Sequence, residues 1–106
     1  MNSLSTTQIK LSNSYKVSKA KGVWGYEDYF QVKCDFYTDG RTITSIESVA
    51  VGPIPGKLAF CNIDTMDEYY LDNRRTYAVK CYGNAITGLT NLGRIKMYAE
   101  FYCSEY

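Results

Sequence analysis

Carboxylates, cysteines and tyrosines are the side chains through which this sequence could do chemistry, because the chain contains no histidine. Without imidazole, Ser-His-Asp and Cys-His arrangements are excluded, as is every zinc site that needs a histidine ligand. A free cysteine could act as a nucleophile, but it would have no histidine to activate it. Acid–base catalysis would therefore have to come from carboxylates or phenols.

The carboxylates show no spacing typical of a catalytic or metal site. They gather in two groups. The first is Glu27–Asp28, and the second consists of Asp64, Asp67, Glu68 and Asp72. The second group could ligate Ca²⁺ or Mg²⁺ but lacks the spacing of a calcium-binding loop. No phosphate-binding GxxxxGK(S/T) or GxGxxG motif occurs. We therefore expect a protein that is not an enzyme and that uses no cofactor and no metal.

The four cysteines leave two readings open. They are Cys34, Cys61, Cys81 and Cys103, and no CxxC pair occurs. As free thiols they would serve as small buried hydrophobes in an intracellular protein. As two disulfides they would staple a secreted domain, with three connectivities to choose from. The sequence does not decide between these redox states, and the location of the protein depends on the choice.

Tyrosine occurs 11 times in 106 residues and falls repeatedly on the polar side of alternating segments. If these segments share a sheet, its outer face carries phenols flanked by lysine and arginine. The residues that we expect to bind a partner are Tyr29, Lys33, Tyr37, Tyr82, Arg94, Lys96, Tyr98 and Tyr102. Tyrosine offers a rigid apolar surface with one polar tip, and Tyr and Arg are enriched at interface hot spots. An ordinary half-exposed strand surface would also favour tyrosine.

The elements that must position these residues are short antiparallel strands. Residues 29–37 alternate strictly, which places four apolar side chains in the core: Phe30, Val32, Cys34 and Phe36. The Thr38–Gly40 segment carries an Asp-Gly turn signal. Residues 41–51 return as the partner strand, with a bulge predicted near Ser45–Ser48 to repair their imperfect alternation.

The C-terminal part of the chain repeats the pattern. The predicted inward residues of its last strand are Ile95, Met97, Ala99, Phe101 and Cys103. A shorter strand covers residues 76–82, with Tyr77, Val79 and Cys81 inward. Weaker strand signals occur at 7–11, 15–19 and 58–61. We predict a mainly β fold, a single antiparallel β-sandwich or compact barrel-like domain over residues 1–106.

One segment departs from the alternation. Thr65 followed three residues later by Glu68 matches a capping box, in which each side chain satisfies an amide at the start of a helix. Asp67 and Glu68 also suit the positive end of a helix dipole. The pattern predicts a helix of one to two turns near residues 65–72.

These observations favour a non-enzymatic binding module, such as a small inhibitor, an effector or a virus-encoded interaction protein, acting through a Tyr-rich strand face. One alternative is a secreted, disulfide-stapled effector or toxin-like domain. Another is a single-stranded nucleic-acid binder that stacks bases on a β platform. A net charge of +1 disfavours nucleic acid, and no apolar run approaches the ~20 residues that span a membrane. We expect a protein partner and no membrane, and the Tyr face could equally be the seam of a homodimer.

Overall fold

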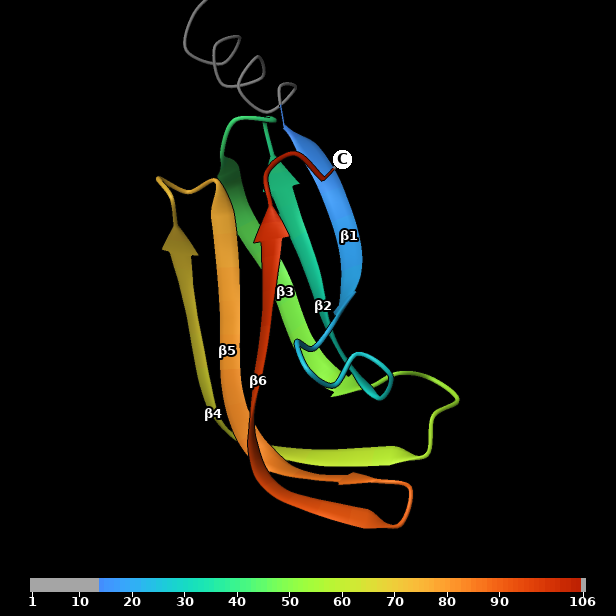
Figure 1. Cartoon of the computed structure of the whole chain (residues 1–106). Helices are drawn as coiled ribbons and strands as arrows, with labels where there is room; N and C mark the ends of the chain where they lie inside the picture. The colour runs from blue at the N-terminus through green and yellow to red at the C-terminus, as the bar shows by residue number, and fades with distance from the viewer. Residues whose placement is uncertain (1–13, 106) are drawn as a thin grey trace, which may run out of the picture.

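The computed structural model describes residues 14–105, which form six antiparallel strands and no helix. One sheet contains β1 (Tyr15–Gly22), β2 (Phe30–Thr38) and β3 (Ile43–Pro53) in that order. The second contains β4 (Ala59–Leu71), β5 (Thr76–Thr87) and β6 (Thr90–Tyr102). Figure 1 shows the two sheets packed against each other, which confirms a mainly β, sandwich-like fold. The strand predicted at 7–11 lies outside the described residues.

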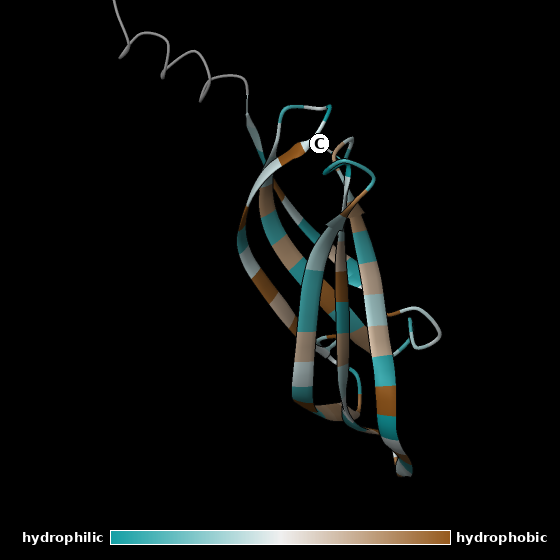
Figure 2. Ribbon diagram, turned by 90° about the vertical axis from the view of Figure 1, so that its left-hand side faces the viewer, coloured by the Kyte–Doolittle hydropathy of each residue, from teal (hydrophilic) through white to brown (hydrophobic). Residues whose placement is uncertain are grey.

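The core lies between the sheets and follows the predicted alternation. Phe30, Val32, Cys34 and Phe36 of β2 are fully buried, and the inward residues predicted for β5 and β6 are buried as well. Figure 2 shows the resulting alternation of hydrophobic and hydrophilic positions along the strands. The rings of Phe36 and Phe101 meet edge to face at 6.2 Å and so join the two sheets. Both sheets therefore depend on one shared core.

The connection between β2 and β3 confirms the predicted turn and bulge. Asp39 accepts hydrogen bonds from the backbone N–H groups of Arg41 and Thr42, both at 2.8 Å, and Gly40 has a φ of 89°. In β3, Glu47 is the extra residue between the pairs Asp35–Ser48 and Phe36–Ile46. This extra residue is the bulge that the broken alternation of 41–51 requires.

The predicted helix at 65–72 is wrong, because residues 65–71 belong to β4 and pair with β5. The Thr65 hydroxyl donates to Asp64 at 2.7 Å instead of capping a helix. Glu68 accepts the Tyr77 hydroxyl at 2.6 Å, a partner that no capping box anticipates. The Thr65 hydroxyl and the Glu68 carboxylate thus have other partners than the backbone amides of a helix. Strand pairing with β5 overrides the local helix signal.

The turn after β4 explains why the strand ends where it does. Asp72, Asn73 and Arg74 all have positive φ angles, of 54°, 53° and 66°. Asp and Asn tolerate this left-handed conformation better than most residues. The Asp72-Asn73 pair is therefore the hairpin signal that marks β4 and β5 as neighbours.

The second sheet bends sharply near its lower end, so that its strands turn beneath the first sheet (Figure 1). The bend coincides with register shifts at Ile63–Thr65 and at Ala85–Ile86. Gly83 lies at this point, where an added Cβ would come within 2.4 Å of the Asn62 carbonyl oxygen. Only glycine fits this close approach of the two strands. Because the sheet bends here, Ala59, Cys61 and Leu92 pack against the core.

Candidate interaction surface

Seven of the eight predicted binding residues lie on two opposite sides of the sandwich, and Tyr29 lies in the turn before β2. Lys33 and Tyr37 belong to β2, and Tyr29 precedes it. The other five belong to the second sheet: Tyr82, Arg94, Lys96, Tyr98 and Tyr102. Because the inner faces of the two sheets share one core, their outer faces point away from each other. The structure therefore divides the expected residues between two faces.

The outer face of the second sheet gathers most of the aromatic and charged side chains. We call it the tyrosine face and define it by Trp24, Tyr69, Lys80, Tyr82, Arg94, Lys96, Tyr98, Glu100 and Tyr102. Cross-strand pairing sets Lys80 opposite Tyr98 and Tyr82 opposite Lys96. The sequence reasoning missed Tyr69, which was assigned to a helix, and Trp24, which lies in a loop.

Trp24 is held on this face by two contacts with β6. Its backbone N–H donates to the Tyr98 carbonyl oxygen at 3.0 Å. Its ring meets the Tyr98 ring edge to face at 4.8 Å. The neighbouring Val23 is fully buried and anchors the loop, while Trp24 itself remains 53% exposed. The indole is thus a large exposed ring in a fixed position.

Glu100 fixes the two phenols on either side of it along β6. Its carboxylate accepts the Tyr98 hydroxyl at 2.5 Å and the Tyr102 hydroxyl at 2.9 Å. Burial and the hydrogen bond to Glu100 raise the pKa of Tyr98, and the hydrogen bond to Glu100 is the main cause of the raised pKa of Tyr102. Both phenols therefore stay protonated at neutral pH, with their rings oriented by one carboxylate.

Carboxylates of β4 restrain two of the cations on the tyrosine face. Arg94 donates to both carboxylate oxygens of Asp64, at 3.0 and 2.8 Å, and its guanidinium stacks over the Tyr82 ring at 4.9 Å. The Arg94 hydrogen bonds are the main reason that the pKa of Asp64 falls to about 2. The Lys80 ammonium lies 3.9 Å from Asp67.

Lys96 differs from these two cations. Its ammonium lies 5.6 Å from the centre of the Tyr98 ring, and within residues 14–105 it forms no ion pair. The side chains around it form an open depression of about 520 Å³ that is lined by Trp24, Tyr69, Lys80, Lys96, Tyr98 and Glu100. This depression combines aromatic walls with the Lys96 ammonium, which forms none of the ion pairs found within residues 14–105, and with the Glu100 carboxylate.

The outer face of the first sheet is built from smaller side chains. Ser18, Ala20, Ser48 and Ala50 occupy its β1 and β3 positions beside Lys33 and Asp35 of β2. Asp35 accepts the Ser48 hydroxyl at 3.0 Å, and Lys16 pairs with Glu47 at 2.8 Å. Of the described aromatic residues, Tyr37 is the one that stands on this face within a strand.

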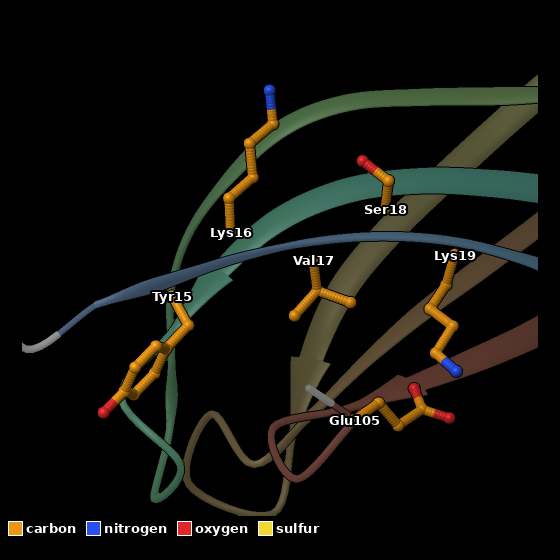
Figure 3. Close-up of a pocket in the computed structure, with 6 residues that line it drawn as sticks. All are labelled: Tyr15, Lys16, Val17, Ser18, Lys19 and Glu105. Atoms are coloured by element: carbon orange, nitrogen blue, oxygen red, sulfur yellow. The ribbon is translucent and has the colours of Figure 1, made fainter.

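A second depression runs along β1 and is lined by Tyr15, Lys16, Val17, Ser18, Lys19 and Glu105. Figure 3 shows that Lys16 and Ser18 point to one side of β1, whereas Val17 and Lys19 point to the other. These side chains do not converge on one point. The depression is therefore an open strand edge without the convergent polar groups of a ligand site.

All four cysteines are free thiols in the structure. Burial raises the pKa of Cys34 to about 12 and that of Cys81 to about 11. Burial also raises the pKa of Cys61, which is only partly covered. The thiolate, which is the reactive form, is therefore scarce at neutral pH.

Among residues 14–105, no group of three histidine, cysteine or carboxylate side chains is placed to hold a metal ion. The same residues contain no helix long and apolar enough to cross a membrane. The chain was compared with protein-family models, curated proteins and solved structures, and no match was found.

Proposed function

We propose that this protein is a non-enzymatic binding module that engages a protein partner through the tyrosine face. The observation that carries the proposal is the fixed, exposed indole of Trp24 beside Tyr98. Trp, Tyr and Arg are the residues most often found at interface hot spots. Side chains that are already oriented lose little conformational entropy when a partner binds.

Charge on this face favours a protein over a single-stranded nucleic acid. Arg94 and Lys80 already face Asp64 and Asp67, so their attraction for phosphates is reduced. The acids would also repel a phosphate backbone that tracked across β4. Lys96 is the cation left to attract an acidic group, which suits a carboxylate at the rim of a protein interface. The four free thiols give no support to a disulfide-stapled variant of this role.

Affinity capture with matched variants tests the proposal. The full chain is immobilised as wild type, as Trp24→Ala with Tyr98→Ala, and as Lys33→Ala with Tyr37→Ala on the opposite face. Proteins retained by the wild type are identified, and their affinities are then measured with purified components. We expect the Trp24/Tyr98 pair to weaken binding at least roughly tenfold and the Lys33/Tyr37 pair to leave it unchanged.

Two outcomes contradict the proposal: binding that survives the loss of Trp24 and Tyr98, or binding that is lost only with Lys33 and Tyr37. Tyr98 also contacts Glu100, so Trp24→Ala alone serves as a milder variant. Circular dichroism of each variant shows whether the fold is kept.

A further inference from the structure

Two three-stranded sheets leave four edge strands, β1, β3, β4 and β6. The unpaired N–H and C=O groups of an edge strand form a template for another strand unless something covers them. At β6, the Trp24 N–H covers the Tyr98 carbonyl. At the start of β3, Arg74 covers the first two residues of the edge. Its side chain donates to the carbonyls of Ile43 and Thr44, and its own carbonyl accepts a hydrogen bond from the Ile43 N–H.

The β1 edge is protected by charge. Lys19 and Lys21 occupy positions on the inner side of this strand, and the Lys21 ammonium pairs with Glu105 of the C-terminal segment. Inward-pointing lysines on an edge strand discourage pairing with another chain. Each of these three edges therefore carries protection at particular positions: at Tyr98 on β6, at Ile43 and Thr44 on β3, and at the lysines of β1.

Within residues 14–105, the first part of β4, together with Leu58 just before it, has none of these devices. Residues 58–63, Leu-Ala-Phe-Cys-Asn-Ile, contain no charge and no proline. Leu58 is 73% exposed and Phe60 is 64% exposed. Within residues 14–105, no other element forms a hydrogen bond to the outer edge of this segment. Such a segment matches the composition of strands that add to other strands.

The direction of the backbone groups can be worked out along this segment. The Gly88 N–H donates to the Leu58 carbonyl at 2.7 Å, so Leu58 faces β5. Alternation then turns the polar groups of Ala59, Cys61 and Ile63 toward the open edge. The Ala59 N–H is already used, since it donates to the Lys57 carbonyl at 3.0 Å. Within residues 14–105, the groups of this edge for which no partner from another element is found are the Ala59 C=O and both groups of Cys61 and of Ile63.

We propose that this edge pairs with the same segment of a second copy. The two segments run antiparallel, and the two-fold axis that relates them passes between the two Cys61 residues. In this register every free group except the Ile63 C=O meets a complementary group of the other copy. The Cys61 N–H of each copy donates to the Cys61 carbonyl of the other, and each Ile63 N–H donates to the Ala59 carbonyl of the other. The Ala59 N–H, which already has a partner inside the chain, is the donor that this pairing leaves unused.

The side chains fit the same register. Phe60 of each copy faces Asn62 of the other, so the two Phe60 rings become diagonal neighbours and cover each other. Asp64 is the only charged residue between 58 and 64, and it falls opposite Leu58. No like charges meet at the seam. The dimer would extend the tyrosine face across a continuous six-stranded sheet.

Sedimentation equilibrium of the full chain tests this pairing. We expect the wild type to form a dimer and Phe60→Lys to raise its dissociation constant at least roughly tenfold, because two ammonium groups would meet at the seam. Leu89→Lys is the matched control, since Leu89 is 100% exposed on the neighbouring β5–β6 turn but lies off the seam. We expect it to leave the dissociation constant unchanged.

A thiol crosslink gives a second readout, which reports where the seam lies. Opposed Cys61 residues would lie about 5.5 Å apart at Cα, within the range of a disulfide. Treatment of the wild type with diamide, a thiol oxidant, should yield a covalent dimer that Cys61→Ser cannot form. The proposal is overturned by a monomer at all concentrations, by a dimer insensitive to Phe60→Lys, or by one whose crosslink survives Cys61→Ser.

Discussion

The outer faces of the two sheets differ far more than their inner faces do. The inner faces are both apolar and share one core. Outside, the first sheet presents serine and alanine on β1 and β3, with ion pairs such as Lys16–Glu47. The second presents the tyrosine face, on which carboxylates orient both phenols and cations.

This difference separates stability from recognition. Alternating strands with a buried face suffice to build either sheet, so neither outer face is needed to form the core. The outer face of the second sheet carries oriented aromatic side chains, whereas the outer face of the first sheet carries mainly small side chains. We infer that the first sheet mainly supports the fold, whereas the second also offers the surface proposed for binding.

The shared core should give the largest effect. Phe36→Ala and Phe101→Ala remove fully buried rings that meet between the sheets. Each should lower the free energy of unfolding by about 3–5 kcal/mol, because a large cavity remains. Urea denaturation followed by circular dichroism measures this loss. A loss confined to one of the two variants would show that the sheets do not depend equally on the shared core.

A glycine in each sheet gives a smaller and opposite pair of effects. In Gly83→Ala the new Cβ would lie 2.4 Å from the Asn62 carbonyl oxygen, so backbone must shift at the bend. We expect a loss of about 1–3 kcal/mol in the free energy of unfolding. At Gly52, on β3, an added Cβ meets nothing within 4 Å, so Gly52→Ala should be neutral or stabilising by about 0.5 kcal/mol.

If Gly83→Ala and Gly52→Ala had the same melting temperature in thermal denaturation, this expectation would be contradicted. It would mean that the close approach of β5 to β4 at the bend does not constrain the second sheet.

The smallest effect concerns the ion pair between Asp64 and Arg94. The pKa of Asp64 is about 2 in the folded chain, below the ordinary value of about 3.9. A lowered folded pKa stabilises the fold above about pH 4, and that contribution is lost as the pH falls through about 2. In Arg94→Gln the pKa of Asp64 should rise toward its ordinary range, which carboxyl NMR titration would detect.

Glu47→Gln on the first sheet is the control for this titration, because it removes an exposed ion pair from the other outer face. It should leave the pKa of Asp64 unchanged. A change of similar size in both variants would point to a general effect of net charge.

Much of the fold could be predicted because strand alternation is local. The inward positions of β2 and β6 follow from spacing alone, and so do the β2–β3 turn and the bulge at Glu47. The segment at 65–71 could not be assigned in this way, since its capping pattern is as local as its strand pattern. Its pairing with β5 decides between them.

The candidate site was predicted only in part. Alternation identified the outward side chains, but it could not assign the strands to sheets. Lys33 and Tyr37 proved to lie across the sandwich from the five residues of the second sheet, and Tyr29 lies in a turn. Trp24 carries no strand pattern, so its place beside Tyr98 could not be foreseen.

By itself, the sequence determined which side of each regular strand is buried, because successive side chains of any extended chain point to opposite faces. Only the tertiary structure decided which strands are neighbours, which outer face gathers the aromatic residues, and which edge the other described residues leave uncovered. These features depend on contacts between residues far apart in the chain, such as Trp24 with Tyr98 and Arg74 with Ile43, and local spacing does not encode them.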